Sequence, residues 1–160
     1  MFFLISYYFG GKKNLYQEVL NAQAVVFFKL IDEIRQMDMP PLSKLRHYVD
    51  ALSKIQETNP ESIPLICREL LSPQPLFEKF VKNKLYILHQ FMTELVTDAI
   101  ACGELHTEIK PTHVAFTLES TIIFYFLTQN QIQELGNYAP GEEGVYLTQV
   151  LNTYLASLSK

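Results

Sequence analysis

The segment LFEKFVKNKLYILHQFMTELVTDAIACG, residues 76–103, has the strongest helical periodicity in this chain. Its apolar side chains recur at spacings of three and four residues, which is typical of an amphipathic α-helix rather than a β-strand. The repeating positions include Leu76, Phe80, Leu88, Phe91, Leu95 and Ala99, with Val81, Leu85, Met92 and Val96 beside them. Gly103 follows the pattern, at the place where a helix commonly ends on a left-handed residue. We therefore expect one long helix that ends just before Gly103.

The rest of the chain repeats this pattern between short clusters of proline, glycine and asparagine. The expected helices run from Lys12 to before Pro40, from Leu42 to Thr58, from Ile63 to Leu71, from Pro111 to Leu135 and across Leu147 to Leu158. Thr58 and Glu61 have the spacing of a capping box, which would begin the short helix after them. The fold class is therefore all-α, a bundle of about six helices.

One of these helices is apolar on nearly every side. Between Val114 and Leu127 its only charged residue is Glu119. A helix of this kind is buried all round, either in a core or against a second subunit. The sequence leaves both possibilities open.

The composition favours one domain without a metal or a cofactor. At 160 residues and 48% hydrophobic, the chain is long enough to bury a substantial core. An excess of 17 acidic over 13 basic residues argues against a surface built mainly to neutralise phosphates. Cys67 and Cys102 lack the spacing of a zinc site or a disulfide framework, so we expect two reduced packing thiols.

No segment is expected to enter or cross a membrane. The longest apolar run away from the N-terminus, residues 120–128, is far shorter than the roughly 20 residues that span a bilayer. No basic residue precedes the apolar start Met1–Phe9, and Lys12 and Lys13 follow it, which is unlike a secretion signal. These features predict a cytoplasmic protein.

Residues suited to catalysis are sparse. His47, His89, His106 and His113 stand singly, without a metalloprotease or nucleophile-elbow motif around them. The pair Gly10–Gly11 is better explained as a turn than as a phosphate-binding loop, because no strand precedes it. We therefore expect no catalytic residue and no metal ligand, and a protein that is not an enzyme.

The segment LISYYFGGKKNLY, residues 4–16, resembles the most recognisable motif of the TetR family of transcriptional regulators. In that motif a recognition helix ends in a Tyr-Tyr-Phe-like run and a glycine turn, and a lysine with a leucine three residues later opens the next helix. The later helices are also similar in order and length to the family's C-terminal domain. The resemblance implies that residues 1–11 are the end of a helix-turn-helix and that residues 12–160 form a ligand-binding and dimerisation domain.

The resemblance assigns roles to both ends of the chain. Tyr7 and Tyr8 would be the surviving end of the recognition helix, or would pack onto the helix that follows. Lys12 would contact a DNA phosphate, helped by its place at a helix N-terminus. The last two long helices would pair with their twins in a homodimer, through Ile122, Phe126, Leu147, Leu151, Tyr154, Leu155 and Leu158.

Most of the family's DNA-reading headpiece has no counterpart in these 160 residues. A recognition helix needs the helix before it to hold it in the major groove. We therefore expect a repressor-type regulator whose specific DNA binding is lost or impaired in this chain, with operator DNA a partner only of a full-length form. The alternative is a stand-alone dimerisation and small-molecule-binding module without DNA-binding activity.

Regulators of this family resemble helical baskets around a mostly apolar pocket. Tyr86, His89 and Met92 are spaced at three residues on one expected helix, and Phe116 and Glu119 have the same spacing on the next. We hypothesise that His89 and Glu119 are the polar groups of a site for a hydrophobic small molecule. The site would be lined by Cys67, Tyr86, Phe91, Met92, Phe116 and Tyr125. A satisfied core histidine and a hydrogen-bonded interface glutamate are the alternatives.

Overall fold

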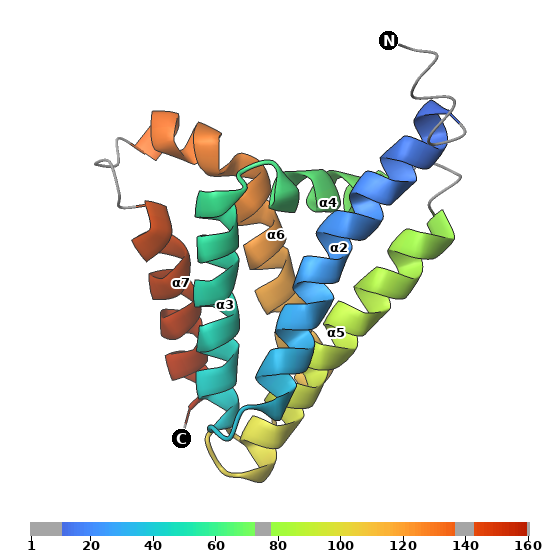
Figure 1. The fold of residues 1–160 in the computed structure, drawn as a ribbon. Helices are drawn as coiled ribbons and strands as arrows, with labels where there is room; N and C mark the ends of the chain where they lie inside the picture. The colour runs from blue at the N-terminus through green and yellow to red at the C-terminus, as the bar shows by residue number, and fades with distance from the viewer. Residues whose placement is uncertain (1–10, 73–77, 137–142, 160) are drawn as a thin grey trace.

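The computed structural model describes residues 11–72, 78–136 and 143–159. Over these residues the chain forms an all-α bundle (Figure 1), which confirms the fold class predicted from the sequence. Its helices are α2 Lys12–Gln36, α3 Pro41–Thr58, α4 Ser62–Leu71, α5 Glu78–Ala101, α6 Pro111–Gly136 and α7 Glu143–Leu158. None of these described helices combines the length and the apolar character needed to cross a membrane.

The helix boundaries lie close to the expected ones. α2 begins at Lys12, and α3 begins at Pro41, where a proline costs no hydrogen bond because the first amides of a helix have no intrahelical partner. α5 ends at Ala101, and Gly103 has a φ of 85°, the left-handed conformation expected after a helix. The end predicted for this long helix is therefore confirmed.

The capping box predicted at Thr58 and Glu61 is wrong. Thr58 is the last residue of α3, and its hydroxyl donates to the carbonyls of Lys54 and Ile55 at 3.0 and 3.1 Å. α4 begins at Ser62 without a side-chain capping bond. The hydroxyl of Thr58 bonds the preceding turn because this residue still has helical backbone, so it is not available to the next helix.

Figure 1 shows how the helices pack against one another. α5 packs against α6 and α3, and α7 lies on α3 and α6. α2 runs obliquely beside α5, to which the ion pair between Arg35 and Glu94 joins it at 2.9 Å. The short α4 crosses the bundle and contacts α2 and α6. α4 therefore lies where α2, α3, α5 and α6 come close to one another.

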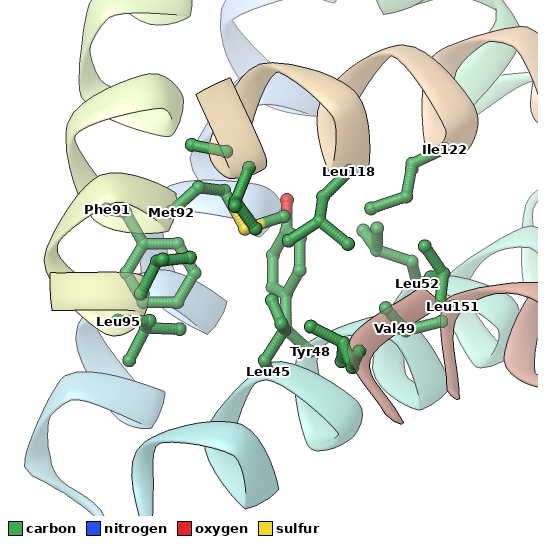
Figure 2. Close-up of a cluster of buried hydrophobic side chains, with 14 of the residues drawn as sticks. Leu45, Tyr48, Val49, Leu52, Phe91, Met92, Leu95, Leu118, Ile122 and Leu151 are labelled. Atoms are coloured by element: carbon green, nitrogen blue, oxygen red, sulfur yellow. The ribbon is translucent and has the colours of Figure 1, made fainter. Parts of the chain in front are cut away.

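Apolar side chains from α2 to α7 form the main core. Figure 2 shows Tyr48 of α3 standing between Met92 of α5 and Leu118 of α6. The rings of Tyr48 and Phe91 meet edge to face, with 5.4 Å between their centroids. Each large apolar side chain buried here contributes roughly 1.5–3 kcal/mol to stability. A smaller cluster joins α2, α4 and α5 and contains Leu20 and Val81, with Tyr16, Leu65, Ile66 and Leu70 packed against them.

The apolar stripe of α7, expected to face a second subunit, is covered within the same chain. Leu147, Leu151 and Leu155 are at most 4% exposed because this side of α7 packs on α3. Leu151 lies beside Val49 of α3 (Figure 2). Within one chain, α3 therefore already covers these three leucines, which we expected to face a twin subunit.

The remaining residues expected at a dimer interface are also partly or wholly covered. Ile122 and Phe126 of α6 are 7% and 2% exposed and belong to the main core. Tyr154 and Leu158 of α7 are half-buried against the same core. Any partner of α6 and α7 must therefore contact their other, exposed sides.

Candidate functional site

An apolar cavity of about 90 Å³ lies where the main core meets the smaller cluster. The helices α2 to α6 all contribute to its wall. Its lining comprises Leu20, Ala24, Phe27, Phe28, Ile31, Tyr48, Leu52, Ile63, Ile66, Cys67, Glu69, Leu70, Val81, Lys84, Leu88, Ile122 and Ile123. Most of these side chains are apolar, so the cavity suits an apolar guest.

Helical spacing explains how these residues come together. On α2, Leu20, Ala24, Phe27 and Ile31 recur at intervals of four, three and four residues, which places them on one side of the helix. α4 and α5 contribute lining residues at similar intervals. Each helix thus turns one apolar face toward the same space.

Two of the lining residues are charged, Glu69 and Lys84. The hydroxyl of Tyr16 donates to Oε1 of Glu69 at 2.5 Å and links α2 to α4. Burial and this hydrogen bond raise the pKa of Tyr16 to about 12. The ammonium of Lys84 lies 4.1 Å from the centroid of the Phe28 ring, whose electron-rich face attracts a cation. Both charges are therefore engaged with side chains of the cavity wall.

Tyr48 brings to the cavity wall a hydroxyl for which the described structure provides no hydrogen-bond partner. Its side chain is only 3% exposed. Burial, with a smaller contribution from nearby Cys67 and Glu119, raises the pKa of Tyr48 above its usual range. Burial also raises the pKa of the Cys67 thiol, to about 12. The hydroxyl and the thiol are therefore both neutral near neutral pH.

Sequence reasoning missed Tyr48 as a lining residue. It lies three residues after Leu45 and four before Leu52, on the apolar stripe of α3. This spacing is the signal that could have found it, because a tyrosine on a buried stripe carries its hydroxyl into the interior. Lys84 lies in the same way among the apolar residues of α5.

The residues predicted to line an effector pocket are dispersed in the structure. Cys67 lines the cavity. Phe91, Met92 and Tyr125 are buried in the main core, outside the cavity lining. Apolar periodicity on α5 and α6 correctly predicts that these residues are interior. The cavity itself lies nearer to α2 and α4, which supply many of its lining residues.

His89 and Glu119 form a hydrogen-bonded pair between α5 and α6. Nδ1 of His89 lies 3.1 Å from both carboxylate oxygens of Glu119. Burial raises the pKa of Glu119, and the hydrogen bond with His89 opposes this shift without cancelling it. His89 and the exposed Tyr86 border a surface groove, and Phe116 of α6 is 66% exposed. The pair joins two helices and does not line the cavity.

The residues predicted to contact DNA lie at the N-terminal end. Tyr7 and Tyr8, with the rest of residues 1–10, lie outside the described residues. Lys12 is the exposed first residue of α2. Within the described ranges, no group of three or more histidine, cysteine or acidic side chains is arranged to hold a metal ion.

Comparisons with known proteins identify a family and a shared fold. Residues 24–153 match the model of the TetR-type family described as YcdC-like protein, C-terminal region. No curated protein is significantly similar to the chain in sequence.

Several solved structures share the fold. The regulatory protein TetR from Rhodobacter sphaeroides is similar with a TM-score of 0.72 at 17% identity, over 92% of this chain and 77% of that one. FadR from Thermus thermophilus, a TetR-family transcriptional repressor in complex with lauroyl-CoA, has a TM-score of 0.69 at 18% identity, over 92% and 74%. An ArpA-like γ-butyrolactone receptor has a TM-score of 0.60 at 16% identity, over 96% and 77%.

Proposed function

Because this chain belongs to the TetR-type family of YcdC-like C-terminal regions, we propose that it is the effector-binding and dimerising body of a ligand-responsive transcriptional regulator of the repressor type. The observation that carries the proposal is the apolar cavity walled by α2 to α6. The proposed role is binding and signalling in the cytoplasm, without catalysis.

The effector is a small molecule with a compact apolar body. The cavity of about 90 Å³ is smaller than the roughly 300–1,000 Å³ of most ligand sites, so a larger effector must widen it. FadR, which shares the fold, holds lauroyl-CoA, a ligand with an apolar chain. An apolar ligand in a cavity lined by apolar side chains removes its surface from water, which contributes favourable free energy to binding.

Widening the cavity offers a route for a signal. α2 lines the cavity through Leu20, Ala24 and Ile31, and the same helix begins at Lys12, the proposed phosphate contact. A ligand that binds better to a state with α2 displaced shifts the population toward that state. The position of Lys12 then depends on whether the cavity is occupied.

A second copy of the chain is the proposed partner of α6 and α7. Phe116 and Phe124 on α6 are each 66% exposed, and Val145 on α7 is 60% exposed. Exposed apolar side chains that together form a patch are typical of surfaces that bind another protein. These side chains, rather than the buried leucines of α7, are the proposed direct contacts of the homodimer.

We expect the chain alone not to select an operator sequence. Its 17 acidic residues outnumber its 13 basic residues, and affinity for DNA grows with the number of phosphates that are neutralised. An electrophoretic mobility-shift experiment with a pool of genomic fragments at about 0.15 M salt should show no selective complex. A saturable complex with one fragment would overturn this expectation and the alternative of a module without DNA-binding activity.

Leucine in place of Ala24 should weaken binding at the cavity. Ala24 is 4% exposed and lines the cavity, so the added carbons occupy the space that a guest needs. The affinity for methylcyclohexane, measured by NMR titration, should fall by roughly tenfold or more, the equivalent of forcing extra volume into a packed site.

Ala22 provides the matched control. It lies on the same helix, one half-turn away, and is exposed. Ala22→Leu should therefore bind methylcyclohexane as the unmodified chain does. Equal affinity in Ala24→Leu and Ala22→Leu would show that the probe binds elsewhere, and the proposed effector site would be abandoned.

A further inference from the structure

Tyr48 is a buried residue of the cavity wall and carries a polar hydroxyl. The side chain is 3% exposed and lines the cavity, and the described structure gives its hydroxyl no hydrogen-bond partner. This hydroxyl is not among the fully buried polar atoms that lack a partner, so part of it remains accessible in the described structure. A guest that accepts a hydrogen bond would give the hydroxyl a partner inside the protein.

The ring of Tyr48 is held in place by its neighbours. Phe91 packs edge to face on it, and Met92 and Leu118 flank it in Figure 2. Phe91 and Met92 are fully buried. A phenol fixed in this way holds its hydroxyl in one position, so little conformational entropy is lost when a guest binds to it.

The chemistry around the hydroxyl favours a neutral guest group. Cys67 is a protonated thiol, and the charged group whose field reaches Tyr48 is the carboxyl of Glu119. An anionic group placed beside Tyr48 would leave water and approach that carboxylate. The cation on the wall, Lys84, is already seated against Phe28.

We propose that Tyr48 is the polar anchor of the cavity and donates a hydrogen bond to a neutral acceptor, such as a ketone or ester carbonyl, on an otherwise apolar effector. This inference rests on the proposed function, because it specifies the ligand class of the same cavity. It assigns Tyr48 the role of a specificity-determining residue.

The test compares cyclohexanone with methylcyclohexane, two rings of similar size that differ in the carbonyl. Binding is followed by NMR through the methyl groups of Ile63 and Ile122, which line the cavity. Tyr48→Phe should weaken cyclohexanone binding by about threefold to tenfold, the usual effect of one hydrogen bond. The same variant should leave methylcyclohexane binding unchanged or slightly improved.

Tyr125→Phe is the matched control. Tyr125 is buried at 5% exposed but lies outside the cavity lining, so its variant should bind both probes normally. The thermal stability of Tyr48→Phe should equal or exceed that of the unmodified chain, because the lost hydroxyl had no partner.

The outcomes separate the inference from the proposed function. If methylcyclohexane binds and cyclohexanone binding survives Tyr48→Phe, the anchor is refuted and the apolar site stands. Tighter binding of cyclohexanecarboxylate than of cyclohexanone would also refute it, in favour of an anionic effector. If neither neutral ring binds at the cavity, the effector site and the anchor fail together.

Discussion

Aspartate in place of Leu155 is expected to unfold the subunit rather than merely separate two subunits. Leu155 of α7 is 1% exposed and lies against α3. Removing a buried leucine costs about 2–5 kcal/mol, and an unpaired carboxylate in the same place adds several kcal/mol. Small domains have only about 5–15 kcal/mol of stability in total. Circular dichroism should therefore show loss of the cooperative thermal transition.

Ala156 is the matched control because it follows Leu155 on α7 and is exposed. Ala156→Asp should keep the helical signal and shift the melting temperature by little. A Leu155→Asp variant that remains folded and has the mass of one chain would mean that Leu155 faces a partner after all. That result would contradict the packing of α7 on α3.

Aspartate in place of Phe124 is expected to convert a homodimer into folded monomers. Phe124 is 66% exposed within the subunit, so the substitution should leave the core intact. In the proposed dimer its ring is covered by the second copy, and a carboxylate there would lose its water without a partner. Light scattering should give a mass near 18.5 kDa in place of twice that value.

Val25 on α2 offers the corresponding control. It is 61% exposed, close to the exposure of Phe124, but lies on a helix outside the proposed interface. Val25→Asp should remain dimeric. Monomers in the unmodified chain, or dimers in Phe124→Asp with an unchanged thermal transition, would remove the support for an interface built on α6.

Much of the secondary structure follows from local pattern. The periodic apolar residues of α5, with Gly103 behind them, predict a helix and its end, and both are found. Pro41 similarly marks the start of α3. These features are local because helix formation depends on residues three and four positions apart and on the chemistry of the ends. The capping box at Thr58 is the exception, since two helices compete for one hydroxyl.

The position of the cavity and the residues that line it could not be predicted in this way. α6 is apolar on nearly all sides, so its sequence does not tell which side meets α5, which meets α7 and which stays exposed. Phe116 was therefore expected inside a pocket and lies outside, at 66% exposed. Tyr48 was passed over because it resembles any other member of a core stripe, and only the packing of α2 and α4 leaves space beside it.

Local patterns along the chain are enough to predict a bundle of amphipathic helices, where most of those helices begin and end, and which of their faces are apolar. What covers each face depends on how the helices pack: α3 covers the leucines of α7, the apolar cavity opens beside Tyr48, and His89 borders a more open surface groove. Periodicity records only the direction of a side chain around its own helix axis. It contains no information about which other helix, or which empty space, lies in that direction.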